Sequence, residues 1–174
     1  HAQGFAYACQ HFGVKGRIYM PVTTPQQKIT KTASFGGNTI EIIMQGDYFD
    51  ETLKAALEYS ENTGAAMLPP FDHLDVIEGQ ASVGVEILNQ LESPPDMIIT
   101  PVGGGGLSSG LVKYFNSYKI QFKFCEPMGG RSLFQSLKHK KLITSDYVDN
   151  FVDGAAVARI GDQNFNILKN QNIE

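Results

Sequence analysis

Hydrophobic positions along the chain follow two spacings in turn, one typical of buried strands and one typical of amphipathic helices. Short apolar runs predict strands, at residues 16–22, 38–44, 65–68, 96–102 and 120–125. Apolar residues three or four apart predict helices between them, at residues 1–12, 24–35, 50–63, 76–91, 107–115 and from 162 onward. Strands and helices that alternate at this length are typical of parallel sheet with helices on both faces, so we predict an α/β fold.

Two adjacent prolines interrupt this pattern near its middle. Pro69 and Pro70 stiffen the chain at a point where the alternation of strands and helices starts again. We therefore predict two lobes, each with its own parallel sheet flanked by helices. Residues 1–68 form the small lobe, and residues 69–174 form the large lobe.

The large lobe contains the sequence TPVGGGGLSSG at residues 100–110, with four consecutive glycines between a predicted strand and a predicted helix. Glycine loses more backbone entropy on folding than any other residue, so four in a row cost about a few kcal/mol. Something must require that backbone. At the start of a helix, unpaired N–H groups and the positive end of the helix dipole suit a phosphate group. We call residues 103–107 the glycine turn.

Three kinds of phosphate compound can be compared with this pattern. No Gly-Lys-Ser/Thr follows the glycines, which excludes a Walker A motif. The dinucleotide pattern is matched by Gly103, Gly105 and an acid about 20 residues on, Glu126, but Ser108 stands where the third glycine packs helix against strand. A single phosphate ester would find a nest of N–H donors with no side chains in the way. Local chemistry favours the monoester over the dinucleotide, and a tight turn without a ligand stays open as a third interpretation.

Composition and charge narrow the class of protein. The chain is 42% hydrophobic and 18% charged, its formal net charge is −4, and it has no apolar run long enough to span a bilayer. The sequence has no dense block of Lys and Arg, which argues against a surface that binds nucleic acid. Cys9 and Cys125 are far apart and lie in apolar contexts, so we expect two reduced, buried thiols. We therefore expect a cytoplasmic protein that binds neither membrane nor nucleic acid.

Both ends of the chain interrupt a helix pattern. Residue 1 is a histidine already in helical spacing with Phe5, and the apolar stripe that starts at Phe165 and Leu168 is hardly finished at Glu174. We expect an internal piece of a longer protein.

Several motifs together resemble a known family. The chain resembles the threonine dehydratases, also called threonine deaminases, in the serine/threonine dehydratase branch of the fold type II, tryptophan-synthase-β-like enzymes that use pyridoxal 5′-phosphate (PLP). The motifs are His1-Ala2-Gln3-Gly4, Met20-Pro21-Val22-Thr23-Thr24-Pro25, Gly46-Asp47-Tyr48-Phe49-Asp50-Glu51, Pro69-Pro70-Phe71-Asp72-His73, Glu78-Gly79-Gln80, Pro101-Val102-Gly103-Gly104-Gly105-Gly106-Leu107, Asp153-Gly154 and Arg159-Ile160-Gly161-Asp162.

The resemblance implies a fold, a cofactor and a reaction. The fold would have two lobes of parallel sheet, incomplete at both ends. The full-length enzyme, expected to be a homo-oligomer, would convert L-threonine or L-serine into 2-oxobutanoate or pyruvate and ammonia, a step of isoleucine biosynthesis in the case of threonine. Gly154 would pass near the cofactor ring. The phosphate of PLP would lie in a cup made by Gly103, Gly104, Gly105, Gly106 and the N–H of Leu107.

By the same resemblance, the catalytic residues lie elsewhere. The Schiff-base lysine and the asparagine beside the cofactor's 3′-oxygen would precede His1, and the serine at the pyridine nitrogen would follow Glu174. We therefore predict no catalytic residue within the chain and no turnover by the chain alone. Glu126 aligns with a carboxylate that helps to bind a divalent cation, but Gly129 and Gly130 stand where a companion acid is wanted, so metal binding stays open.

Two rival interpretations remain. One is a nicotinamide-dinucleotide module built on the residues of the dinucleotide pattern, and the other is a relative that keeps the fold without the chemistry. His73 follows an aspartate in the Pro69-Pro70 segment, and we expect it to be a hydrogen-bonded structural residue rather than a base.

Overall fold

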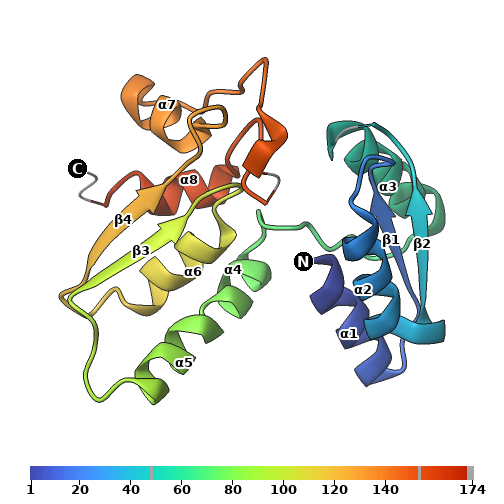
Figure 1. Ribbon diagram of the computed structural model, residues 1–174, viewed down its shortest axis with the longest axis horizontal. Helices are drawn as coiled ribbons and strands as arrows, with labels where there is room; N and C mark the ends of the chain where they lie inside the picture. Colours follow the sequence, from blue (N-terminus) through green and yellow to red (C-terminus); the bar gives the residue numbers. More distant parts are fainter. Residues whose placement is uncertain (48, 153, 172–174) are drawn as a thin grey trace. The chain divides into compact units, whose positions relative to one another are not determined.

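The computed structural model describes residues 1–47, 49–152 and 154–171 of the 174-residue chain (Figure 1). Strands and helices alternate along it, and both of its sheets are parallel, so the α/β prediction is confirmed. Contacts divide the chain into two compact units, His1–Leu68 and Pro69–Glu174. None of the helices in the described ranges has the length and apolar character needed to cross a bilayer.

In the described residues, the first unit has a two-stranded parallel sheet, three α-helices and one short 3₁₀ helix. Strand β1 pairs with β2 in a register that places Gly16 opposite Ile40 and Met20 opposite Met44. The elements are α1 (Ala2–Phe12), β1 (Gly16–Met20), α2 (Gln26–Gly36), the short 3₁₀ helix η1 (Gly37–Thr39), β2 (Ile40–Met44) and α3 (Phe49–Thr63).

Helices cover both faces of this sheet because side chains alternate along β1. Ile18 and Met20 are buried on one face against Ala6 of α1. On the other face, the Arg17 guanidinium lies 4.2 Å from the centre of the Tyr59 ring in α3. Helices α1 and α2 therefore pack on one face of the β1–β2 sheet, and α3 packs on the other.

Two local predictions in this unit are wrong. The sequence predicts Thr24 as the N-cap of the helix that follows it. Helix α2 instead begins at Gln26, and its N-cap is Pro25, which has an extended ψ of 133°. Residues 65–68, predicted as a strand, have no strand pairing. A strand needs a neighbour that pairs with its backbone groups, and this segment has none. Leu68 is also 50% exposed, so the short apolar run did not correctly predict a buried strand here.

The second unit is also built on two parallel strands. Strand β3 pairs with β4, with Met97 opposite Gln121 and Pro101 opposite Cys125. The elements are α4 (Leu74–Gln80), α5 (Ser82–Gln90), β3 (Met97–Pro101), α6 (Gly106–Tyr114), β4 (Gln121–Cys125), α7 (Ser132–His139), the 3₁₀ helix η2 (Asn150–Val152) and α8 (Asp162–Leu168).

A single apolar cluster holds these elements together around α6. It joins β3 and β4 to α6, α7 and α8, and its buried members are Ile98, Val102, Leu111, Val112, Phe115, Phe122, Leu133, Ile160, Phe165 and Leu168. Ser108, Ser109 and Gly110 of α6 are buried as well. The start of α6 is therefore fixed firmly against the end of β3, and this fixes the turn between them.

The predicted helix over residues 76–91 is two helices, α4 and α5, that meet at Ala81. The break lies where α6 approaches closely. A Cβ built on Gly110 would lie 2.7 Å from the Ile77 carbonyl oxygen and 2.8 Å from the Ala81 nitrogen. Apolar spacing alone does not reveal such a contact, because the other helix lies far along the chain.

The two thiols differ in exposure. Cys9 is 3% exposed, and burial raises the pKa of its thiol. Cys125 is exposed, and neither cysteine forms a disulfide. The prediction of two buried thiols is thus correct for Cys9 and wrong for Cys125, because Cys125 shares the exposed face of β4 with Gln121 and Lys123.

Candidate functional site

The glycine turn connects the end of β3 to the start of α6, in the predicted order of strand, glycines and helix. The amide of Val102 donates to the Cys125 carbonyl at 2.9 Å, so the parallel pairing continues up to the turn. Gly105 then takes a left-handed conformation with φ of 93° and is the N-cap of α6. Only glycine adopts this conformation without steric cost, which explains one of the four glycines.

Close packing explains another of the glycines. A Cβ on Gly104 would lie 2.2 Å from the ring of Phe71, and one on Gly105 would lie 2.8 Å from Cβ of Asn164. Real Cβ atoms essentially never approach other atoms so closely. The residues around the turn therefore leave no room for side chains at these two positions.

Hydrogen bonding in the glycine turn is one-sided. The Gly104 carbonyl accepts from the amide of Gly161 at 3.1 Å, and the Gly105 carbonyl accepts from the amide of Ser109 at 2.9 Å. Within the described ranges the amides of residues 103–107 donate no hydrogen bond. The turn thus keeps its N–H groups free at the N-terminal end of α6, where partial positive charge accumulates, and an anion fits this arrangement.

Gly154 lies beside this turn. A Cβ on Gly103 would be 3.4 Å from the Gly154 carbonyl oxygen and 3.1 Å from Cα of Ala155. The structure therefore brings this predicted site residue next to the glycine turn, although about 50 residues separate the two in sequence. Asp153 of the same motif and Tyr48 of the motif at 46–51 lie outside the described residues.

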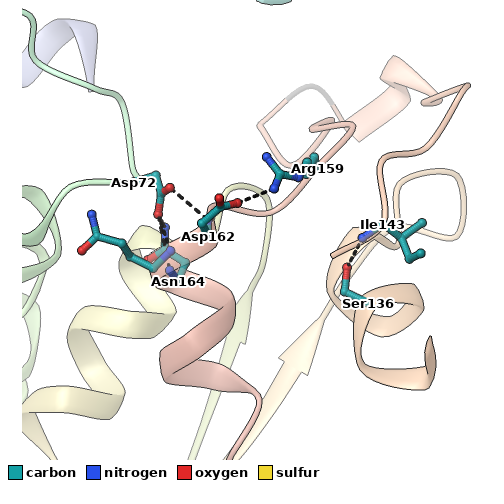
Figure 2. Close-up of polar contacts among 7 residues, drawn as sticks. Asp72, Ser136, Ile143, Arg159, Asp162 and Asn164 are labelled. Atoms are coloured by element: carbon teal, nitrogen blue, oxygen red, sulfur yellow. Dashed lines mark hydrogen bonds and ion pairs between the residues drawn. The ribbon is translucent and has the colours of Figure 1, made fainter. Parts of the chain in front are cut away.

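Asp72 belongs to one of the motifs named above, but the sequence pattern assigned it no role near the glycine turn; Figure 2 shows it beside the start of α8. Its carboxylate accepts hydrogen bonds from the first-turn amides of α8, from Asp162 at 2.9 Å, Gln163 at 3.0 Å and Asn164 at 3.4 Å. A carboxylate at this end of a helix satisfies otherwise unpaired N–H groups. Asp72 thus caps α8 from a segment about 90 residues away, and no local signal predicts such a cap.

Asn164 is the second residue that sequence reasoning missed. Its side chain is fully buried, and its Nδ2 donates to the carbonyl of Phe71 and to that of Gly104, each at 3.0 Å. Its Oδ1 has no partner among the described residues. The only sequence signal is an amide residue directly before Phe165 in an otherwise apolar stripe.

Glu126 caps a helix in the same way. Its two carboxylate oxygens accept from the amides of Leu133 and Phe134 at the start of α7, each at 2.8 Å. Burial raises the pKa of Glu126, and the two amide hydrogen bonds oppose that rise. In the described ranges no three His, Cys, Asp or Glu side chains gather as metal ligands would. A metal-binding role for Glu126 stays a prediction.

His73 and Ser108 have structural contacts. The Nδ1 of His73 accepts from the Asp75 amide at 3.3 Å and caps α4, so the expectation of a hydrogen-bonded structural residue is confirmed. The Ser108 hydroxyl is buried 2.7 Å from the hydroxyl of Thr100, between α6 and β3. A hydroxyl therefore fills the position where the dinucleotide pattern needs helix and strand in direct contact, which weighs against a dinucleotide.

Comparison with known proteins identifies the family. The model of a family described as "Pyridoxal-phosphate dependent enzyme" matches residues 1–174. The chain belongs to this family. Because PLP carries a single phosphate ester, membership agrees with the monoester interpretation of the glycine turn.

Two curated relatives from different bacteria carry the same name. The chain is 43% identical over 171 residues to "L-threonine dehydratase biosynthetic IlvA" of Bacillus subtilis, covering 97% of this chain and 40% of the relative. It is 45% identical over 163 residues to the protein of that name from Mycobacterium tuberculosis, and the match covers 92% of this chain and 38% of that protein. The resemblance to threonine dehydratases is confirmed, and the chain spans about two fifths of the length of these relatives.

Solved structures with the same fold include threonine deaminase isoform 2 from Solanum lycopersicum, in its processed form. It is 38% identical, has a TM-score of 0.87, and the match covers 97% of this chain and 49% of that one. Maize serine racemase has a TM-score of 0.88 at 27% identity, with 99% and 52% covered. The predicted fold type II class is confirmed.

Proposed function

We propose that this chain is the central part of a PLP-dependent L-threonine dehydratase, and that its glycine turn binds the phosphate of the cofactor. The observation that carries the proposal is the set of amides at residues 103–107, which donate to nothing within the described ranges. Four of these five residues have no side chain that could block an approaching anion. The residues present therefore fit a phosphate monoester.

The proposed role of the turn follows from electrostatics. Hydrogen bonds from N–H groups to a charged oxygen contribute about 1.5–3 kcal/mol each, and the dipole of α6 adds to them. We propose that the Gly154 backbone, which lies next to Gly103, borders the same cofactor. When bound, PLP supplies the electron sink for elimination of the substrate's β-hydroxyl. The turn's part is to hold the cofactor in one place.

The substrate and products are also proposals. The names of the relatives support L-threonine as substrate. The resemblance to the threonine dehydratases implies 2-oxobutanoate and ammonia as products and isoleucine biosynthesis as the setting. L-Serine, giving pyruvate, is the alternative, because a serine racemase shares the fold. We propose that the Schiff-base lysine belongs to the part of the protein outside residues 1–174, and that the full-length enzyme is a cytoplasmic homo-oligomer.

The test uses the full-length protein that contains this chain. It should take up PLP, seen as a visible absorbance band, and release 2-oxobutanoate from L-threonine. Gly105→Ala should lose most of the bound PLP, because alanine is strained at a φ of 93° and its Cβ would meet Asn164. The matched control is Gly79→Ala in α4, where a Cβ meets nothing within 4 Å, and PLP binding should be unchanged.

Two results would contradict the proposal. One is a full-length protein that neither binds PLP nor forms a 2-oxoacid from threonine or serine. The other is saturable binding of a nicotinamide dinucleotide that Glu126→Ala weakens, since Glu126 is the acid of the dinucleotide pattern.

A further inference from the structure

We propose that Asn164 is a positioning residue for the phosphate site, acting through the peptide between Gly104 and Gly105, and that Asp72 holds Asn164 in place. This inference rests on the proposed function of the glycine turn. It concerns two residues that lie in other segments of the chain and that need not touch the cofactor themselves.

Two hydrogen bonds fix the direction of the peptide group between Gly104 and Gly105. The Gly104 carbonyl accepts from Nδ2 of Asn164 at 3.0 Å and from the amide of Gly161 at 3.1 Å. The chain has no cis peptide bond among its described residues, so this peptide is trans and planar, with its C=O and N–H on opposite sides. Two donors on the Gly104 carbonyl therefore point the Gly105 N–H away from the start of α8.

The surrounding acceptors fix the orientation of the Asn164 side-chain amide. The acceptors around Nδ2 are the carbonyls of Gly104 and Phe71, each at 3.0 Å, and Oδ1 of Asp72 at 3.5 Å. A flip would bring the amide oxygen against these acceptors, so Nδ2 must face them. The donor thus has a single orientation, directed at the turn.

This orientation leaves the other atom of the Asn164 amide without a hydrogen bond among the described residues. Oδ1 of Asn164 is buried without a partner in the described part of the chain, and Asn164 is 0% exposed. An unsatisfied buried oxygen lowers stability, and such groups occur where another requirement outweighs the loss. The same side chain supplies a donor for the Gly104 carbonyl.

Asp72 fixes the position of Asn164 by holding the helix that carries it. Its carboxylate binds the amides of Asp162, Gln163 and Asn164 in the first turn of α8 (Figure 2). The hydrogen bonds of a charged acceptor are about twice as strong as neutral ones. Asp72, Asn164 and Gly104 thus form one chain of contacts from the segment at 69–73 through α8 to the glycine turn.

A merely structural role would give a different result from a positioning role. If Asn164 only stabilises the fold, its loss lowers the affinity for a phosphate-bearing and a phosphate-free ligand alike. If it aims the Gly105 amide, its loss lowers affinity for the phosphate-bearing ligand alone. The ratio of the two affinities separates these cases.

The experiment titrates the full-length apoprotein with PLP and with pyridoxal, which lacks the phosphate. Asn164→Ala should lower the affinity for PLP roughly tenfold, which is the effect of about one hydrogen bond to a charged group. Its affinity for pyridoxal should stay within about twofold of that of the unmodified protein. Asp72→Asn should also lower the affinity for PLP, by a smaller factor. The control is Asn166→Ala on the exposed face of α8, which should change neither affinity.

The outcomes separate this inference from the function on which it rests. Equal affinities of the unmodified protein for PLP and pyridoxal would overturn both. A preference for PLP that persists unchanged in Asn164→Ala would overturn the positioning role alone. If Asn164→Ala does not fold, Asp72→Asn, which keeps the shape of its side chain, decides by the same ratio.

Discussion

Glu126 shows how one residue can take the place of a helix cap that the local sequence does not supply. The N-cap of α7, Arg131, makes no side-chain capping bond, and the Glu126 carboxylate binds the amides of Leu133 and Phe134 instead. Asp72 does the same for α8. Glu126 ties α7 to the loop before it, whereas Asp72 ties α8 to the distant segment at 69–73.

The raised pKa of Glu126 predicts a pH dependence of stability. Burial raises the pKa of this carboxyl group in the folded protein, so the folded state keeps its proton to a higher pH than the unfolded state does. The contribution of Glu126 to the free energy of unfolding therefore falls as pH rises from the ordinary carboxyl pKa of about 4, through the raised pKa of Glu126. Urea titrations at several pH values measure this slope.

The matched variant for that experiment is Glu126→Gln, which cannot titrate. The difference in unfolding free energy between the unmodified protein and the variant should change in favour of the variant as pH rises. A difference that is constant over this range would show that the folded and unfolded states share one pKa for Glu126.

Helix α6 carries the glycine turn, and its packing predicts the effect of a single methyl group. A Cβ on Gly110 would meet the backbone of α4 at Ile77 and Ala81. Backbone cannot move aside as a side chain can, so Gly110→Ala should destabilise the protein by about 1–3 kcal/mol. Gly79→Ala, the same change on the exposed side of α4, should be neutral or stabilising by up to about 1 kcal/mol.

Denaturant unfolding of both variants checks this prediction. The midpoint should fall for Gly110→Ala, with no fall for Gly79→Ala. Equal midpoints would mean that α4 and α6 do not depend on the close approach at Gly110.

Local sequence predicts the elements of this chain better than it predicts their connections. The strand, the glycines and the helix at residues 96–115 could be predicted because turn residues and apolar spacing act within a few positions. The break at Ala81 and the caps from Asp72 and Glu126 depend on contacts between distant segments. The same holds for the candidate site. The glycines could be predicted from the sequence, whereas the role of Asn164 could not.

The two units of the molecule have apolar cores of different size, and this predicts different local stability. In the first unit the buried cluster consists of Ala6, Ile18 and Met20, whereas the cluster of the second unit joins five elements. Because stability follows buried apolar area, amides of β3 and β4 should exchange hydrogen more slowly than those of β1 and β2.

Hydrogen exchange of the isolated chain, followed by mass spectrometry, tests this order. Residues 66–68, whose amides donate no hydrogen bond in the described structure, give the internal reference for fast exchange. Equal protection of the two sheets would contradict the prediction.

The hydrogen bond from Asn164 to Gly104 also has a consequence for protein synthesis, because it spans 60 residues. At about 5–20 residues per second, a ribosome needs roughly 3–12 seconds to reach Asn164 after it has added Gly104. During that interval the nascent glycine turn lacks the donors from residues 161 and 164. On the proposed function, the nascent turn therefore reaches its full affinity for the phosphate only after Asn164 has been added.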